Sequence, residues 1–287
     1  MKKSKIKLAD VTTYKFGGYC NNYYEINSEI DLLSLDYSKI DIDNLFILGK
    51  GSNVVFSDDG YSGTVIKPNI DFIELSPGRK SLKLGAATFL PDVARFSKEN
   101  SIADLEWLIG IPGSVGGAVR MNAGAYGFEF SQHIKAVTLF NFETAKIEIK
   151  DKSYFEFSYR SAHNLENKMV VSVDLNIDNG DSQLIQKNIS NNLKQRKLTQ
   201  PAAIYNAGSV FKNPTENSAG YLIEKAGLKG HTIGGVSVSD KHANFFVAKK
   251  GASSQSLFEL VNFTKAVILE KFDIELEEEI VFIGNFT

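Results

Sequence analysis

The first residues whose types and spacing suggest chemistry form a short loop, Gly49-Lys50-Gly51-Ser52-Asn53, directly after an apolar run at 45–48. Its two glycines allow positive φ angles and let a ligand approach the backbone closely. Successive backbone amides, with Ser52 and Asn53, can form an anion-binding concavity suited to a diphosphate. The G-x-G-x-x-G dinucleotide fingerprint is absent, because Val54 occupies the third glycine position. A tight turn between strands explains the same residues, so this loop alone does not decide the function.

A second and longer glycine-rich segment runs from Gly110 to Gly127 and contains six glycines in eighteen residues. This density conflicts with an ordinary helix or strand interior. The segment lacks the G-K-[ST] ending of a P-loop, which argues against an NTPase. We interpret it as backbone wrapped around a large flat or phosphorylated ligand, with a purely structural loop as the alternative.

Composition narrows the functions that these loops can serve. The chain has 287 residues, is 43% hydrophobic and carries a net charge of −2, so we expect a sizeable core and no basic nucleic-acid-binding face. Cys20 is the only cysteine and the four histidines stand far apart, which argues against a disulfide framework and a zinc site. The sequence predicts no membrane span, and its lysine-rich start lacks the apolar core of a signal peptide. We expect a solvated basic N-terminus and a cytoplasmic protein without a metal.

Short strands must position the first loop. Runs of apolar and β-branched residues between Gly and Asp/Asn turns predict strands at 45–48, 54–56, 64–66, 72–75 and 82–84. Two helices are predicted among them, at 28–33 with a capping serine and at 91–96 with a proline in the first turn. Further strands are predicted at 136–141, 146–149 and 169–177. The order indicates a β-rich meander rather than a regular βαβ array.

The residue composition changes at Asn179-Gly180-Asp181-Ser182, which predicts a domain boundary. A polar helix is predicted after it, at about 182–198. We expect an N-terminal region at 1–180, with subdomains at about 1–70 and 71–180, and a C-terminal domain at 181–287. In the C-terminal domain the sequence predicts a helix at 219–226, which ends at Gly227. It predicts another helix at about 254–272, which opens with the capping box Ser256-x-x-Glu259. Its predicted strands lie at 235–238, 244–248 and 280–283.

Seven segments, in the same order along the chain, resemble the motifs of one enzyme family: Thr12–Gly18, Gly49–Asn53, Gly110–Gly127, Phe157–Arg160, Ala207–Pro214, Leu222–Gly230 and His242–Phe245. The family is UDP-N-acetylenolpyruvoylglucosamine reductase, a flavoenzyme of peptidoglycan (cell wall) synthesis. The short spacing between the predicted helix at 182–198 and Ser209 resembles the class without an inserted tyrosine-bearing loop.

The resemblance implies an α+β fold. A two-part FAD-binding region of the vanillyl-alcohol-oxidase type would precede a C-terminal α+β substrate domain. It also implies non-covalent FAD, NADPH as reductant and a sugar-nucleotide substrate whose enolpyruvyl group is reduced to give UDP-N-acetylmuramate. The implied cofactor-binding residues are Gly49, Lys50, Gly51, Ser52, Asn53, Gly110, Ile111, Pro112, Gly113, Ser114, Gly116, Gly117, Asn122, Ala123 and Gly124.

The same resemblance assigns the catalytic roles to Arg160, Ser209 and Glu279. An arginine suits a carboxylate because its planar fork is always cationic. A serine is a weak acid, so Ser209 needs activation as a proton donor, and Lys212 is the candidate for this by sequence. Glu279 precedes Gly284 at the family's spacing, although the flanking Pro and Arg are missing. The implied substrate-binding residues are Tyr159, Lys212, Asn213 and Glu224.

Two other functions remain open at this point. One is a different FAD enzyme of the same fold, such as an oxidase acting on an alcohol or a sugar. The other is a catalytically silent protein that binds a flavin or a sugar nucleotide. The Gly208–Pro214 motif and the Tyr159-Arg160 pair argue against the oxidase, and the joint presence of Arg160, Ser209 and Glu279 argues against the silent binder.

Overall fold

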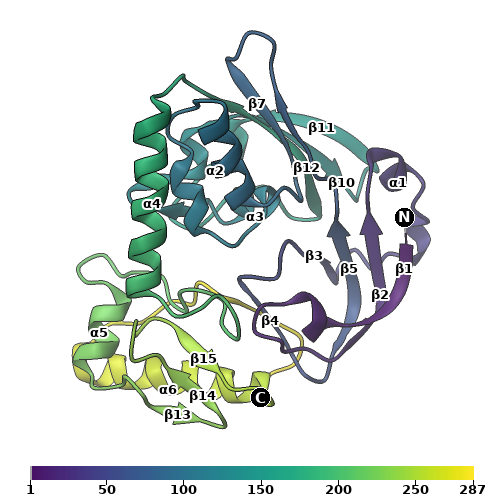
Figure 1. Cartoon of the computed structure of the whole chain (residues 1–287). Coiled ribbons are helices and arrows are strands. Elements are labelled where there is room, and N and C mark those ends of the chain that lie inside the picture. Colours follow the sequence, from purple (N-terminus) through teal and green to yellow (C-terminus); the bar gives the residue numbers. More distant parts are fainter. Residues whose placement is uncertain (1) are drawn as a thin grey trace. The chain divides into compact units, whose positions relative to one another are not determined.

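The largest sheet of the protein is antiparallel and has the strand order β11-β10-β12-β7-β6. We describe residues 2–287 from a computed structural model, in which this sheet packs against helices (Figure 1). Its strands are β6 (Ile73–Leu75), β7 (Ser81–Gly85), β10 (Ile134–Asn141), β11 (Lys146–Asp151) and β12 (Lys168–Asn176). Each lies within a few residues of a predicted strand.

The central strand β12 contributes to two apolar cores. Val170 belongs to one that includes α2 (Leu90–Glu99), α3 (Val115–Arg120) and α4 (Ser182–Thr199). Val171 belongs to another, built with α1 (Glu29–Leu33). A strand buried in this way is expected to be a nearly continuous apolar run, which is why its sequence predicted a strand without alternation.

A second sheet has the order β1-β2-β5-β3. Its strands are β1 (Lys2–Lys7), β2 (Tyr19–Ile26), β3 (Leu45–Ile47) and β5 (Tyr61–Pro68), with β3 and β5 parallel. The sequence predicted neither β1 nor β2. The basic N-terminus is therefore a strand, in which Lys3, Lys5 and Lys7 are exposed to solvent. Charged side chains suit a strand at the edge of a sheet, because they discourage pairing with another chain.

Two compact units interleave along the chain. Unit 1 comprises the residues up to 4, Asn22–Lys50 and Gly63–Arg196, and unit 2 comprises Lys5–Asn21, Gly51–Ser62 and Lys197–Thr287. This division differs from a single boundary near residue 180, because α4 belongs to unit 1 as far as Arg196 and because early residues join unit 2.

The core of unit 2 explains why early residues join the C-terminal part of the chain. Tyr14 and Phe16 stack at 5.2 Å and are buried with Val55 among C-terminal apolar residues. The hydroxyl of Tyr14 donates to the carbonyl of Phe246 at 2.9 Å. The Thr12–Gly18 motif thus builds the core of unit 2.

Unit 2 contains a three-stranded sheet in the order β13-β14-β15 and a parallel pair of β4 with β16. Its elements are β4 (Val54–Phe56), α5 (Ala219–Lys225), β13 (Thr232–Ile233), β14 (Val236–Val238), β15 (Phe246–Ala248), α6 (Ser254–Phe272) and β16 (Val281–Ile283). The predicted capping box at Ser256 is wrong. The cap is Ser253, whose side chain accepts from the N–H of Ser256 at 3.1 Å, so Ser256 already lies inside the helix.

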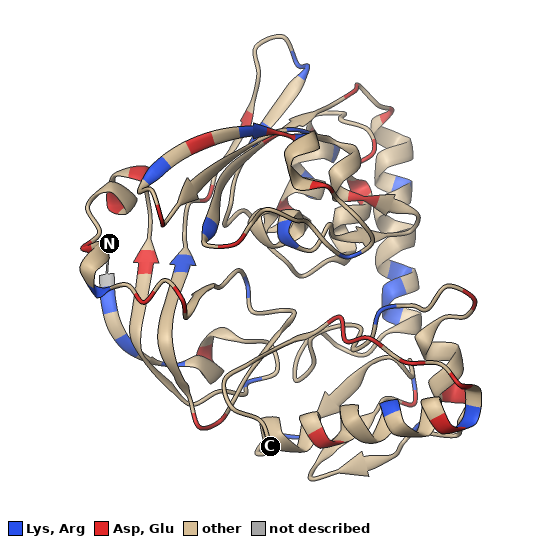
Figure 2. Cartoon of the chain, turned by 180° about the vertical axis from the view of Figure 1, so that it is seen from behind, with Lys and Arg blue, Asp and Glu red and all other residues tan. Residues whose placement is uncertain are grey.

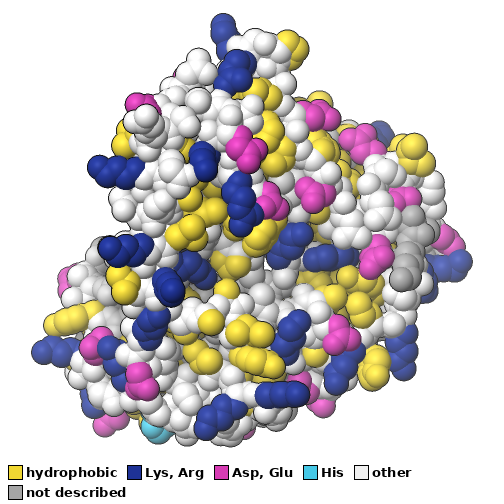
Figure 3. Space-filling view, viewed as in Figure 1, with side chains coloured by type: hydrophobic (Ala, Val, Ile, Leu, Met, Phe, Trp, Pro, Cys, Tyr) yellow, Lys and Arg dark blue, Asp and Glu magenta, His cyan; other side chains and the backbone are white. Residues whose placement is uncertain are grey.

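The remaining elements are short. They are β8 (Gly124–Ala125), β9 (Phe128–Glu129) and 3₁₀ segments at Leu8–Val11, Tyr37–Lys39, Glu106–Gly110, Phe130–Gln132 and Lys152–Phe155. Basic and acidic side chains are interspersed along the elements (Figure 2), and apolar side chains lie in small groups between charged ones on the face in Figure 3. No helix within residues 2–287 is both long and apolar enough to cross a membrane.

Candidate active site

The second glycine segment contains a helix, which corrects the expectation that its glycines exclude one. α3 begins after Ser114, whose Oγ accepts from the N–H of Gly117 at 3.4 Å. Gly116 packs closely, since an added Cβ would lie 3.3 Å from the carbonyl oxygen of Ala86. At Gly117 an added Cβ would meet only the Ser114 Oγ, at 3.5 Å. A serine cap allows a helix to begin despite two glycines in its first turn.

The two glycine segments lie against each other within unit 1. A Cβ on Gly49 would lie 2.9 Å from the Oγ of Ser114, so Gly49 permits this approach. The Nζ of Lys67, on β5, donates to the carbonyl of Gly49. Burial and the neighbouring Lys50 lower the pKa of Lys67 to about 8. Two lysines beside a glycine loop make a local positive field, which favours an anionic ligand.

Sequence reasoning missed Lys67. The available signal was a lysine at the end of the apolar run Thr64-Val65-Ile66, where a charge needs a local reason.

Helix α4 holds both ends of the second glycine segment. Arg196 donates to the carbonyl of Gly110, and the hydroxyl of Tyr126 donates to the carbonyl of Asn192 at 3.1 Å. Ile111, Pro112 and Gly113 lie between the anchored Gly110 and the start of α3. The carbonyl of Gly113 accepts from Leu90 N–H at 3.0 Å. The polar helix predicted at 182–198 therefore fixes the loop that precedes α3.

Asn122 and Gly124 connect this segment to Arg160. The Asn122 Nδ2 donates to the Ser158 carbonyl at 2.9 Å and to Glu129 Oε2 at 3.0 Å, so the protein uses both of its protons. The Arg160 Nη2 donates to the Gly124 carbonyl at 2.9 Å. Gly124 must lack a side chain, because a Cβ would lie 2.6 Å from the carbonyl oxygen of Phe128 and also 2.8 Å from Arg160 Nη1. Ala123, between them, donates its N–H to the Ala118 carbonyl at 2.9 Å.

The catalytic candidate Arg160 lies in a tight turn of unit 1. Ser158 and Ser161 exchange two backbone hydrogen bonds of 3.1 Å, and Arg160 between them has a φ of 55°. Its guanidinium also lies over the Tyr159 ring, 5.0 Å from the centroid, and Tyr159 is exposed. A positive φ in a non-glycine residue is a strained conformation that a functional position can retain.

The loop that carries Ser209 is held from two sides within unit 2. The buried Asn244 accepts through its carbonyl from Val210 N–H at 2.9 Å and through Oδ1 from Phe211 N–H at 3.0 Å. Its Nδ2 donates to the Phe211 carbonyl at 2.8 Å. Asn244 was outside the predicted site, although the His242–Phe245 motif contained it. Ser209 is half-buried beside this clamp.

The C-terminal segment holds the other side of the serine loop. The N–H of Glu279 donates to the Val210 carbonyl at 2.8 Å, and the N–H of Lys212 donates to the Glu277 carbonyl at 2.8 Å. Phe211 and Glu278 form an isolated antiparallel bridge. Val210 lies next to Ser209, so these bonds bring Glu279 close to the serine along the backbone.

Ion pairs distinguish the acidic residues of this segment. Lys212 pairs with Glu277, and Lys265 pairs with Glu278 at 2.9 Å. Glu279 is joined through its backbone to Val210 and to the side chain of Asn53. The ammonium of Lys212, which the sequence suggested as an activator of Ser209, pairs with the exposed Glu277 in this structure.

The first glycine loop contributes its last residues to unit 2. Gly51 has a φ of 68°, and a Cβ there would lie 2.2 Å from the Val11 carbonyl, so packing alone requires this glycine. Ser52 is half-buried. Asn53 turns its side chain toward the C-terminal segment, donating from Nδ2 to the Glu279 carbonyl at 2.9 Å.

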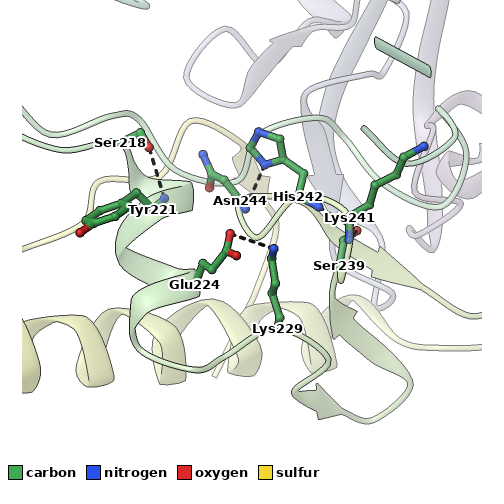
Figure 4. Close-up of polar contacts among 8 residues, drawn as sticks. All are labelled: Ser218, Tyr221, Glu224, Lys229, Ser239, Lys241, His242 and Asn244. Carbon is green, nitrogen blue, oxygen red and sulfur yellow. Dashed lines mark hydrogen bonds and ion pairs between the residues drawn. The ribbon is translucent and has the colours of Figure 1, made fainter. Parts of the chain in front are cut away.

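The remaining substrate candidates are Asn213, which contacts the start of α5, and Glu224, which lies within α5. The Asn213 Oδ1 accepts from the N–H of Ala219, the first residue of α5, at 3.1 Å. Glu224 faces Lys229 in an ion pair of 2.8 Å (Figure 4). Nearby, burial and the Lys229 charge lower the pKa of His242. Glu224 thus has a cationic partner within unit 2.

The predicted residues fall into two groups, each described within its own unit. Unit 1 brings together Gly49, Ser114 and Gly117, and separately Asn122, Gly124 and Arg160. Unit 2 brings together Asn53, the Ser209 loop and the 277–279 segment.

Comparisons with known proteins agree with these motifs. Residues 39–148 match an FAD binding domain, and residues 200–283 match the C-terminal domain of UDP-N-acetylenolpyruvoylglucosamine reductase. The crystal structure of this reductase from Thermus caldophilus superimposes with a TM-score of 0.86 and 29% identity, covering 99% of this chain and 100% of that one.

Curated relatives extend over almost the whole chain. The reductase of Bacillus subtilis is 37% identical over 285 residues, which is 97% of this chain and 92% of the relative. That of Legionella pneumophila (strain Paris) is 36% identical over 281 residues, with the same coverage. The fold is α+β, with an FAD-binding domain before a C-terminal domain. With this identity over nearly its full length, the chain belongs to the UDP-N-acetylenolpyruvoylglucosamine reductase family.

Proposed function

We propose that this chain is an FAD-containing oxidoreductase that reduces the enolpyruvyl group of UDP-N-acetylglucosamine enolpyruvate with NADPH. The product, UDP-N-acetylmuramate, is a precursor of peptidoglycan. The observation that carries the proposal is the Ser209 loop, whose backbone is joined to Glu279 through the Val210 carbonyl. This bond brings the backbone of a carboxylate residue next to the loop that carries the proposed proton donor.

The residues of unit 1 fit FAD. Gly117 is uncrowded, since an added Cβ would meet only the Ser114 Oγ at 3.5 Å, so its backbone stays open to a ligand. Lys50 and Lys67 add positive charge beside Gly49, which suits a diphosphate. FAD, when bound, carries the hydride from NADPH to the substrate.

The other named residues act on the substrate. Hydride addition to the methylene carbon leaves negative charge on the neighbouring carbon and its carboxylate. Arg160, an always-charged planar fork, binds that carboxylate and stabilises the charge. Ser209 Oγ donates a proton to the carbon. Tyr159, Lys212, Asn213 and Glu224 are proposed to bind the sugar nucleotide.

The reaction itself is tested by anaerobic turnover. The flavin of the purified holoenzyme should be bleached by NADPH and restored by the enolpyruvyl sugar nucleotide, with UDP-N-acetylmuramate identified by mass spectrometry. An alcohol or a sugar that reduces the flavin, while the enolpyruvyl compound leaves it reduced, would favour an oxidase instead.

A substitution at Gly117 tests whether the second glycine segment, Gly110–Gly127, binds FAD. In Gly117→Val the side chain meets little of the protein, so it should intrude on the ligand and weaken FAD binding about tenfold or more. FAD affinity is measured by flavin fluorescence, and circular dichroism checks folding. Gly78→Val is the matched control, because a Cβ at Gly78 meets no atom within 4 Å. A folded Gly117→Val protein with unchanged affinity would place the flavin elsewhere.

Lys67 predicts a pH dependence of FAD binding. Its pKa, lowered to about 8 by burial and Lys50 against the attraction of Glu25, means that it is charged at pH 7 and neutral well above pH 8. A bound diphosphate favours the charged form, so FAD affinity should fall as the pH rises through about 8. The decrease should be about tenfold for each unit by which FAD raises that pKa.

The titration is repeated on two variants. In Lys67→Arg the side chain stays charged, so FAD affinity should no longer fall with rising pH. In Lys67→Met the charge is absent, so FAD affinity should be low at every pH. A wild-type decrease that persists in Lys67→Met would assign the titration to another group.

Ser209→Ala separates the two half-reactions. Reduction of the flavin by NADPH should remain nearly intact, because the serine has no role in it. Reoxidation by the enolpyruvyl substrate should slow by about 10²–10⁴-fold, the usual contribution of a general acid. Stopped-flow absorbance of the flavin measures both rates, with Ser237→Ala on β14 as the control. Equal losses in both half-reactions would indicate a role in folding or cofactor binding.

A further inference from the structure

Asn53 ends the first glycine loop and directly precedes β4, yet its hydrogen bonds lead to the other end of the chain. Its Nδ2 donates to the carbonyl of Glu279 at 2.9 Å. Its own carbonyl accepts from the N–H of Val281 at 3.0 Å. One residue therefore holds the chain on both sides of Ile280.

The backbone of Glu279 is fixed from two directions. Its carbonyl receives the Asn53 amide, and its N–H donates to the Val210 carbonyl at 2.8 Å. Both of these polar groups are thus used within unit 2. They connect the first glycine loop to the neighbour of Ser209 through a single residue.

Regular structure does not fix Glu279 by itself. β16 begins only at Val281, and Glu278 contributes one isolated bridge. Glu279 lies at the bend between them. The orientation of the peptide that follows Glu279 contributes to the direction of its side chain, and the Asn53 amide holds the oxygen of that peptide.

We propose that Asn53 is a positioning residue for Glu279, which sets the carboxylate beside the Ser209 loop. The family resemblance assigned Asn53 to the cofactor, and in the structure its Nδ2 donates to the Glu279 carbonyl. The catalytic consequence of this positioning rests on the proposed function, whereas the positioning itself does not.

The activity test uses Asn53→Ala in the FAD-loaded enzyme. Loss of one positioning hydrogen bond should slow substrate-driven flavin reoxidation about tenfold, while reduction by NADPH and the FAD dissociation constant stay within about twofold. The effect should shrink toward onefold in a Glu279→Gln background, because the group being positioned is then gone. Asn262→Ala, an exposed asparagine on α6, is the matched control.

A second readout does not depend on turnover. Hydrogen–deuterium exchange of the peptide that covers 277–283 should speed up about tenfold in Asn53→Ala and stay unchanged in Asn262→Ala. Unchanged exchange would overturn the positioning role. If Asn53→Ala weakened FAD binding but left flavin reoxidation normal, Asn53 would be a cofactor-binding residue. If Asn53→Ala had the same effect with Glu279 as with Glu279→Gln, the two residues would act independently. A wild-type enzyme that is inactive on the enolpyruvyl compound but shows the exchange effect would refute the proposed function alone.

Discussion

The pairing of residues 210–212 with 277–279 is the interaction on which the serine half of the site depends. The serine loop belongs to no regular sheet, so its backbone polar groups need partners from elsewhere. The C-terminal segment supplies the Glu279 N–H and the Glu277 carbonyl, and Asn244 supplies three further hydrogen bonds. If the segment shifted by one residue, Glu278 or Ile280 would stand beside Val210 in place of Glu279.

The same constraint explains why unit 2 recruits residues from the start of the chain. Thr13 accepts through its carbonyl from Tyr205 N–H at 3.0 Å and donates its hydroxyl to the Asn206 carbonyl at 2.7 Å. Its N–H donates to the Gly51 carbonyl at 3.0 Å. One residue thus braces the approach to Ser209 and the first glycine loop. In unit 1, Gly49 and Gly124 serve close approaches to Ser114 and Arg160, so protein packing already requires several of the glycines that suggested a ligand.

Local patterns predicted the elements well, and long-range partners could not be predicted from them. Helix 254–272 has the predicted bounds, because its apolar spacing and flanking serines are local signals. The serine that caps it was misassigned, since Ser253 and Ser256 fit the same pattern and only the backbone decides. The strands β1 and β2 were missed because lysines and tyrosines conceal their alternation. Neither the bond from Asn53 to Glu279 nor the ion pair of Lys212 with Glu277 has a sequence signal, since each joins residues that are distant in the chain.

The most direct test of this account compares three neighbouring carboxylates. Flavin reoxidation by the enolpyruvyl substrate is measured in Glu277→Gln, Glu278→Gln and Glu279→Gln. Glu277 and Glu278 are held by lysines, so their variants should stay within about threefold of the wild-type rate. Glu279→Gln should lose about 10²-fold or more. A damaging Glu277→Gln together with a silent Glu279→Gln would show that the active carboxylate is not the one beside Val210, and would contradict the account.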